Sequence, residues 1–369
     1  MKDHANLDQN FNKLDAQLSR KSRFFTRGTK RRVWLTIFIV MSALLGCQRD
    51  SSSALSRAHI ASSDVQKNSV PSFYASTWIL TYMAQRLLSR ANDKGDQADV
   101  RMITPLGQDP ARYVPDTQTL LAMQSAHLII LNGALFERGL QTVSLPMTRV
   151  LKTASALRDQ WLEYPQGFSR SQHQHGPKGK HDHQGVDGHT WLDPHLLRQQ
   201  LTQMKIRISQ MRPTSAPAYA QLIKDIDRLD QFWLKLSIPL RQRELISNHP
   251  AYQYIARRYQ LKITPFDLSP DETPSASQTD RIRQHVHQHL SHQEASDPSR
   301  PVIMLWETSP SPDVRKALSS LPLIHIVLHT LEQPPPDARN HSRLDIDPLL
   351  LYIDQLHELA STLEITHER

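Results

Sequence analysis

Short apolar runs alternate with amphipathic stretches along the chain from Val70 onward. The runs have the length of single buried strands, and the stretches between them repeat apolar side chains at helical spacing. This alternation is typical of an α/β fold with largely parallel sheets. The predicted strands are Val70–Tyr74, Val100–Thr104, His127–Leu131, Glu244–Asn248, Lys262–Phe266, Val302–Trp306 and Ile324–Leu328.

A long helical pattern from about Ala216 to Leu236 divides this part of the chain into two α/β halves. We therefore predict two α/β lobes with mostly parallel sheets, joined by one long helix. Ligands of open α/β sheets bind beyond the carboxyl ends of the strands, so we expect a metal cleft between the lobes. The other predicted helices are Thr77–Arg90, Asp116–Ser125 with Asp116 as N-cap, Ala251–Tyr259, Ser275–Leu290 and Asp347–Leu363.

A different pattern occurs near the N-terminus, where Lys30-Arg31-Arg32 precedes the largely apolar 13-residue run Val33–Leu45. As a helix this run would be about 20 Å long, short of the ~30 Å hydrocarbon core, which favours the core of a signal peptide. Leu44-Leu45-Gly46-Cys47 resembles the bacterial lipobox. That resemblance implies cleavage before Cys47 and lipidation of this residue; the alternative is an uncleaved anchor helix with a chance cysteine.

These patterns predict an extracytoplasmic protein anchored to a membrane, either periplasmic or on the cell surface. The segment after Cys47, up to residue 68, is polar and lacks a hydrophobic repeat, which is typical of a flexible tether. The expected organisation is a signal peptide (1–46), a lipid-anchored flexible tether (47–68), an N-terminal α/β lobe (69–212) that includes a histidine-rich loop (170–187), a linking helix (213–240) and a C-terminal α/β lobe (241–369).

Charge and cysteine content narrow the function. The formal net charge is +8, but residues 1–46 hold nine bases and three acids, and the rest of the chain holds 35 bases and 33 acids. This balance argues against a nucleic-acid binder with a basic face. A single cysteine excludes an internal disulfide and a multi-thiolate metal site, so a metal here needs His, Asp or Glu. Histidine is abundant, with 19 residues.

The histidines form two dense stretches. The first lies among polar residues, which predicts a mobile surface loop that captures metal; the alternative is a solvated linker. Its members are His173, His175, His181 and His183. The second ends a predicted helix, where helical spacing puts His285, His289 and His292 on one face with His287 beside them. This spacing allows metal chelation, but we favour a polar helix end.

Three other histidines follow predicted strands or short ordered segments: His189, His249 and His329. A single histidine at a strand end is more often structural. Three at the predicted edge of one cleft indicate a metal site.

The order of motifs across residues 70–365 resembles the solute-binding lipoproteins of zinc and manganese ABC transporters. The matching segments are Ser72-Phe73-Tyr74, Pro105–Pro115 (PLGQDPARYVP), Ala126–Gly133 (AHLIILNG) with Glu137 and Leu140, the histidine-rich loop, Gly188–Pro194 (GHTWLDP) and Asn248–Tyr259 (NHPAYQYIARRY). Their co-occurrence in this order is more specific than any one of them.

The resemblance implies that His189 and His249 bind the metal. The family's first histidine ligand falls on Ala111, and its C-terminal aspartate falls on His329. The implied set is therefore three histidines with an open corner, which water or Glu307 completes. Arg112 adds a cation that disfavours a metal unless an anion screens it.

Imidazole ligands suit Zn²⁺ better than Mn²⁺, which prefers carboxylates. We therefore expect a monomeric lipoprotein that captures Zn²⁺ and delivers it to an ABC permease without catalysing a reaction. One alternative is a degenerate relative that acts as a metal buffer, a sensor or a binder of another ligand. A three-histidine zinc hydrolase is less favoured, because no general acid or base partner is evident.

Overall fold

The computed structural model describes residues 71–89, 98–165, 172–174, 180–182, 185–292, 301–335 and 346–365. The predicted signal peptide, Cys47, the tether, His175 and His183 lie outside the described residues. The segment Gln66–Arg369 forms one compact unit. Among the residues described, no helix combines the length and the apolar character needed to cross a membrane.

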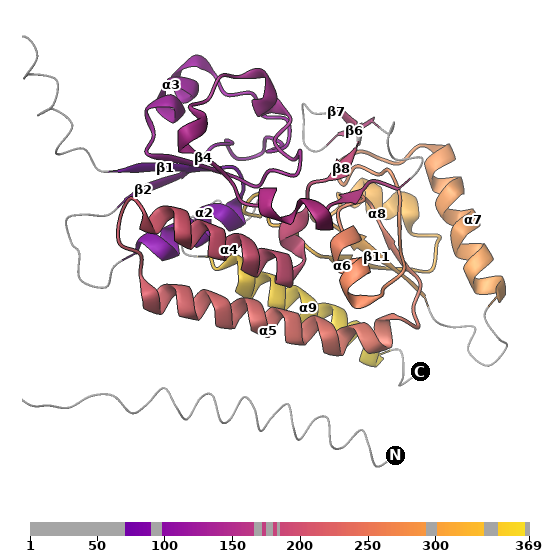
Figure 1. Cartoon of the computed structure of the whole chain (residues 1–369). Coiled ribbons are helices and arrows are strands. Elements are labelled where there is room, and N and C mark those ends of the chain that lie inside the picture. Colours follow the sequence, from indigo (N-terminus) through magenta and orange to yellow (C-terminus); the bar gives the residue numbers. More distant parts are fainter. Residues whose placement is uncertain are drawn as a thin grey trace, which may run out of the picture. The chain divides into compact units, whose positions relative to one another are not determined.

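The N-terminal lobe is built on a parallel sheet with the strand order β2-β1-β3-β4 (Figure 1). Its central strand β3 is buried along its whole length because Leu, Ile, Ile and Leu fill it and both of its faces are covered. The strands are β1 (Ser72–Ala75), β2 (Asp99–Met102), β3 (Leu128–Leu131) and β4 (Val150–Lys152).

The C-terminal lobe repeats this topology in a second parallel sheet, with the order β10-β9-β11-β12. The strands are β9 (Leu245–Ser247), β10 (Ile263–Pro265), β11 (Val302–Trp306) and β12 (Leu323–Val327). In each sheet the strand order reverses once, between β1 and β3 and between β9 and β11. Such a switch point opens a crevice at the carboxyl ends of the strands, where α/β proteins bind ligands.

Helices cover the sheets and begin at capping side chains. Asp116 accepts a hydrogen bond of 2.7 Å from the backbone N–H of Thr119, which confirms it as the N-cap of α3. Asp193 caps α4, which starts with Pro194. The helices are α2 (Trp78–Leu88), α3 (Thr117–Ser125), α4 (Pro194–Ser209), α5 (Ala216–Leu240), α6 (Gln253–Tyr259), α7 (Ala276–His292), α8 (Pro312–Leu318) and α9 (Pro348–Ile365); 3₁₀ turns occupy Gly139–Thr142, Met147–Arg149, Ser155–Gln160 and Thr190–Leu192.

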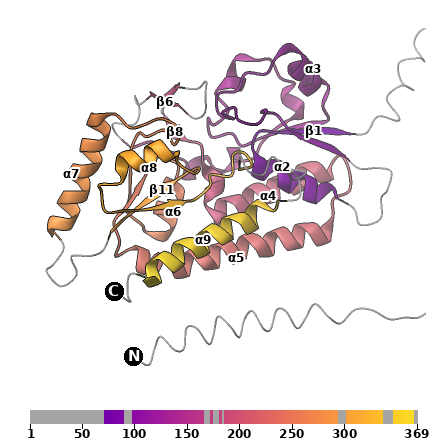
Figure 2. The same cartoon turned by 180° about the vertical axis from the view of Figure 1, so that it is seen from behind.

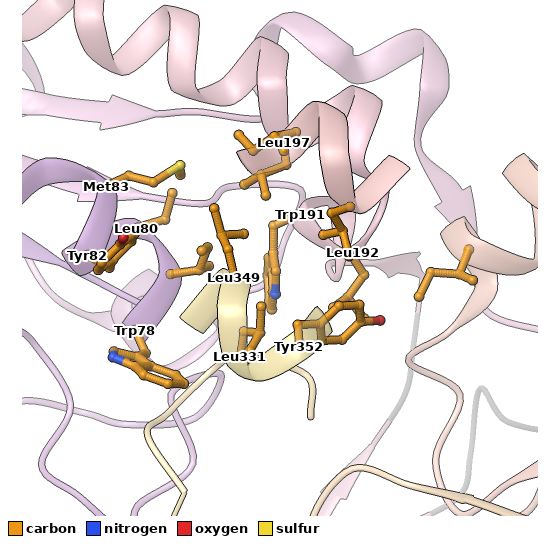
Figure 3. Packing of buried hydrophobic residues seen from close by; sticks show 14 of the residues in the cluster. Trp78, Leu80, Tyr82, Met83, Trp191, Leu192, Leu197, Leu331, Leu349 and Tyr352 are labelled. Carbon is orange, nitrogen blue, oxygen red and sulfur yellow. The ribbon is translucent and has the colours of Figure 1, made fainter. Parts of the chain in front are cut away.

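Two helices, α5 and α9, lie side by side beneath both sheets (Figures 1 and 2). One hydrophobic cluster draws side chains from both lobes and from these helices. Figure 3 shows part of it, in which Leu349 and Trp191 lie between Tyr82 of α2 and Tyr352. The two α/β lobes joined by α5 confirm the predicted fold class, and α9 adds a second connection that the sequence did not indicate.

The histidine-rich loop, which we expected to be mobile, contains short paired strands. Two short antiparallel strands, β6 (Gln172–Gln174) and β7 (Lys180–Asp182), place His173 opposite His181. The segments before and after them also pair, as β5 (Leu162–Glu163) with β8 (Val186–Asp187). The expected loop therefore contains paired backbone at these positions, and its capture of metal stays a prediction.

Candidate metal centre

A narrow pocket of about 40 Å³ brings together side chains from both lobes. On this measure one water molecule needs about 10–15 Å³, so the pocket has room for an ion or a few water molecules. A larger hollow of about 540 Å³ lies beside the N-terminal sheet, and its lining residues include no histidine. The narrow pocket is lined by Asp109, Ala111, Arg112, Leu135, Phe136, Arg138, Tyr164, Val186, Gly188, His189, His249, Glu307 and Glu332.

His189 is held at the pocket by a carboxylate behind its ring. The side chain is 4% exposed, and Nδ1 lies 2.6 Å from Oδ1 of the fully buried Asp187. The same oxygen accepts the backbone N–H of His189, and Oδ2 accepts Nε2–H of Gln253 on α6. This carboxylate–imidazole pair fixes the ring and leaves Nε2 directed at the pocket, where it lies 3.0 Å from Oε1 of Glu332.

Residues that directly follow β3, at the switch point of the N-terminal sheet, hold the segment around His189 by hydrogen bonds. Asn132, directly after β3, donates from Nδ2 to the backbone oxygen of Gly188 at 2.8 Å and accepts from Thr190. The buried carboxylate of Glu137 accepts the N–H groups of Asn132 and Gly133 in turn. Gly188 approaches so closely that an added Cβ would lie 2.7 Å from Cβ of Phe136, so a side chain at this position would displace the segment.

His249 comes directly after β9, at the C-terminal switch point. Its Nδ1 lies 3.3 Å from Oε2 of Glu307, and both side chains are buried. Asn248 fixes Glu307 by accepting its backbone N–H and donating to its Oε1. The rings of His249 and His189 meet edge to face with centroids 5.4 Å apart, so the two histidines predicted to bind metal lie together.

Glu332, and not the predicted His329, completes the group at the pocket. His329 is absent from the pocket lining, and its backbone N–H donates to Oε1 of Gln355 at 2.9 Å. The chain then turns through Leu331, whose φ of 60° is left-handed, and this turn brings Glu332 to His189. The structure thus places His189 and His249 at the pocket and His329 outside its lining, and Glu332 lies three residues after His329.

The segment that carries Glu332 is bonded across the cleft to the N-terminal lobe. The backbone oxygen of Thr330 accepts Nε1–H of Trp191 at 2.6 Å, and the backbone oxygen of Glu332 accepts the N–H of Trp78 at 2.8 Å. Gln333 adds side-chain hydrogen bonds to the loop at 105–108. A C-terminal carboxylate is thus held in a fixed position against N-terminal elements.

Ala111 lines the pocket, as the sequence comparison with the family implies, and presents only a methyl group. The neighbouring cation Arg112 is joined there by Arg138, which the sequence analysis did not identify. The two cations balance the charge of Glu307 and Glu332. Arg138 immediately follows Glu137 of the family-like segment, a position in the sequence that could have indicated it.

The carboxylates around His189 change the pKa of its imidazole strongly. Burial lowers its pKa, but the carboxylates of Asp187 and Glu332 outweigh burial and raise the pKa to about 10. Without a metal, the imidazole is therefore protonated at neutral pH and donates to a carboxylate on either side. A metal ion that binds Nε2 must displace this proton.

Zinc binding should consequently release about one proton from His189 near neutral pH. We expect the affinity to rise roughly tenfold per pH unit between about pH 6 and 8, because the competing proton dissociates only near the raised pKa. Competition against a chelator, corrected for the chelator's own protonation, measures this slope. Asp187→Asn should flatten it by lowering the pKa of His189, and a flat profile in the parent protein would show that zinc binding releases no proton from His189.

The described residues contain no three His, Cys, Asp or Glu side chains already arranged around a common point as metal ligands. In the pocket, the four groups instead form two pairs, His189 with Glu332 and His249 with Glu307. Imidazole nitrogens and carboxylate oxygens are the donors that divalent transition metals take. A cation entering between the pairs would replace the hydrogen bond between His189 and Glu332 and the contact between His249 and Glu307 by coordination.

Known proteins resemble this chain in sequence. The high-affinity zinc uptake system protein ZnuA of Bacillus subtilis is 25% identical over 202 residues, covering 53% of this chain and 62% of the relative. The zinc-binding lipoprotein AdcA of Streptococcus pneumoniae is 25% identical over 199 residues, covering 52% and 39%. The match thus spans less than two thirds of either relative.

Solved structures share the fold. The Zn(II)-bound ZnuA-like domain of Streptococcus pneumoniae AdcA superposes with a TM-score of 0.60 at 17% identity, over 80% of this chain and 99% of that domain. The metal-dependent lipoprotein YcdH of Bacillus subtilis gives 0.59 at 19% identity, over 78% and 98%. The model of the family described as ZnuA, zinc-uptake complex component A, periplasmic, matches residues 74–292, more than half of the chain. The chain therefore belongs to the ZnuA family.

Proposed function

We propose that this chain captures Zn²⁺ in the pocket between its lobes and passes it to an ABC permease. The observation that carries the proposal is the pairing of two buried imidazoles with two carboxylates at one small pocket between the lobes. Relatives named for zinc uptake and zinc binding support it. Family members are binding components of uptake systems, so the chain is not an enzyme.

The ligands in this proposal are Nε2 of His189, an imidazole nitrogen of His249, and the carboxylates of Glu307 and Glu332. Two nitrogen and two oxygen donors suit tetrahedral Zn²⁺. The carboxylates are ligands that Mn²⁺ also accepts, and the two imidazoles favour zinc over manganese. Glu332 replaces the C-terminal carboxylate of the family from a position three residues further along, and no side chain replaces the histidine absent at Ala111.

The proposal places the protein outside the cytoplasm as a monomer, held to a membrane by lipid on Cys47. The lipobox-like sequence and the relatives described as lipoproteins support this anchor. A tethered receptor remains near the permease that it supplies, while its folded part is free to dock. His173, His175, His181 and His183 would add weak, exchangeable capture sites near the pocket, because their loop leads into β8 and His189.

Loss of zinc uptake tests this function. Cells that depend on the full-length protein for zinc should grow in chelator-treated medium with the parent, and His249→Ala should abolish that growth because it removes one metal ligand. His287→Ala is the control, since His287 is exposed on α7 and away from the pocket. Equal growth of the His249→Ala strain, with equal protein levels, would refute zinc delivery through this pocket.

A further inference from the structure

The second histidine stretch converges on a carboxylate that the sequence analysis did not associate with it. Nε2 of His285 lies 2.7 Å from Oε1 of Glu244, and Nδ1 of His289 lies 3.4 Å from Oε2 of the same carboxylate. The two histidines are one helical turn apart on α7, so their rings project from the same face. A single carboxylate therefore contacts an i, i+4 histidine pair with both of its oxygens.

This cluster is separate from the pocket between the lobes. Glu244 directly precedes β9, whereas His249 follows the same strand, so the two groups stand at opposite ends of the C-terminal sheet. Helix α7 lies on the outer side of the C-terminal lobe (Figures 1 and 2). None of the three side chains lines the narrow pocket.

The surroundings hold the cluster in place and leave one side open. The backbone of Glu244 is fixed by the hydrogen bond that its oxygen accepts from Ile303, and its side chain is 8% exposed. The ring of His285 packs edge-on against Phe266 at 5.6 Å between centroids. The histidine side chains are 25% and 27% exposed, so part of each side chain is open to solvent.

The chemistry of the cluster matches a zinc site with two histidines and one carboxylate. Ligand atoms at about 2.0–2.1 Å from tetrahedral zinc are roughly 3.3 Å apart. The contact of His289 with Glu244 is already at this separation, and that of His285 would have to open by roughly half an ångström. The ligands do not yet surround a common point, because the carboxylate is hydrogen-bonded directly to an imidazole.

Lys262 opposes a cation at this position, because it is near enough to act electrostatically on Glu244. Its charge should make the cluster a weaker site than the pocket, which has two carboxylates. We propose that Glu244, His285 and His289 form a second, exchangeable zinc-binding site on the outer side of the C-terminal lobe, with water at the fourth position. The polar helix end that the sequence favoured is thereby reinterpreted as a site.

Zinc stoichiometry of the full chain tests this proposal. Equilibrium dialysis against Zn²⁺ should show that His289→Ala binds about one ion fewer than the parent, whereas His287→Ala, exposed on the same helix, binds as many as the parent. Glu244→Gln should also lose about one ion, since it keeps the shape of the side chain and removes its charge. If both His289→Ala and Glu244→Gln bind as many ions as the parent, the site does not exist.

Hydrogen exchange locates the lost ion. Zinc should slow amide exchange in α7 of the parent, of His287→Ala and of His249→Ala, because the ion would join this helix to the start of β9. It should not do so in His289→Ala or Glu244→Gln. Should His289→Ala prove unfolded by circular dichroism, the near-isosteric Glu244→Gln decides alone. Protection of α7 that disappears in His249→Ala and persists in Glu244→Gln would assign the effect to the pocket and overturn the proposal.

Discussion

Replacing Glu332 with Gln should weaken zinc binding at the pocket by about 100-fold or more, while His329→Ala should leave it unchanged. Glu332 lies 3.0 Å from Nε2 of His189, and its charge offsets that of a divalent ion in a buried site. Changes in groups that only support a ligand already cost 10–100-fold in metal affinity, so a ligand itself should cost at least as much. Competition with a chelator of known affinity measures both variants.

The pair of variants separates the structural assignment from the one drawn from sequence. His329→Ala is a matched control because His329 lies three residues from Glu332 on the same segment and is absent from the pocket lining. A large loss of affinity in His329→Ala, with little change in Glu332→Gln, would show that the chain turns differently after β12 and that the three-histidine set is correct.

Introducing a histidine at Ala111 should tighten zinc binding by about tenfold or more. The methyl group of Ala111 lines the pocket, at the position where the family has its first histidine ligand. A neutral imidazole there would supply a nitrogen donor from the N-terminal lobe, and 1.4 kcal/mol of added binding free energy corresponds to a factor of ten. It should also slow zinc release, because a further ligand must dissociate.

Two further variants make the test at Ala111 specific. Ala111→Phe adds a ring of similar size without a donor nitrogen, so it should not tighten binding. Arg112 brings a positive charge to the same pocket, and the double variant Ala111→His with Arg112→Ser should bind more tightly than either single change. If no histidine-bearing variant binds zinc more tightly than the parent, position 111 does not face the metal.

The fold was predictable where apolar residues form continuous runs or recur at a regular spacing in the sequence. Each predicted strand is present with its ends shifted by no more than a few residues, because apolar runs such as Val302–Trp306 can only be satisfied inside a sheet. Strand β4, with three residues, is too short to give such a signal. Helix α4 was overlooked although Leu197, Leu201, Met204 and Ile208 repeat at helical spacing. The packing of α9 along α5 depends on tertiary contacts that no local pattern encodes.

The candidate site was predictable only in part, because one of its residues lies on a loop whose course the sequence does not indicate. His189 and His249 adjoin ordered segments whose boundaries the sequence marks, and they meet because both lobes present their switch points to one pocket. Glu332 could not be placed, because its position depends on the left-handed turn at Leu331 and on hydrogen bonds to the other lobe. Glu244 escaped notice because it lies 41 residues before His285 in the sequence.

Anomalous diffraction at the zinc absorption edge from crystals of the zinc-loaded protein is the most direct test of metal binding in the pocket. The account predicts a peak between the two imidazole–carboxylate pairs, within about 2.0–2.2 Å of Nε2 of His189, a ring nitrogen of His249 and oxygens of Glu307 and Glu332. A fully occupied zinc ion bound by His329, or a pocket without zinc while the ion is bound elsewhere, would contradict it.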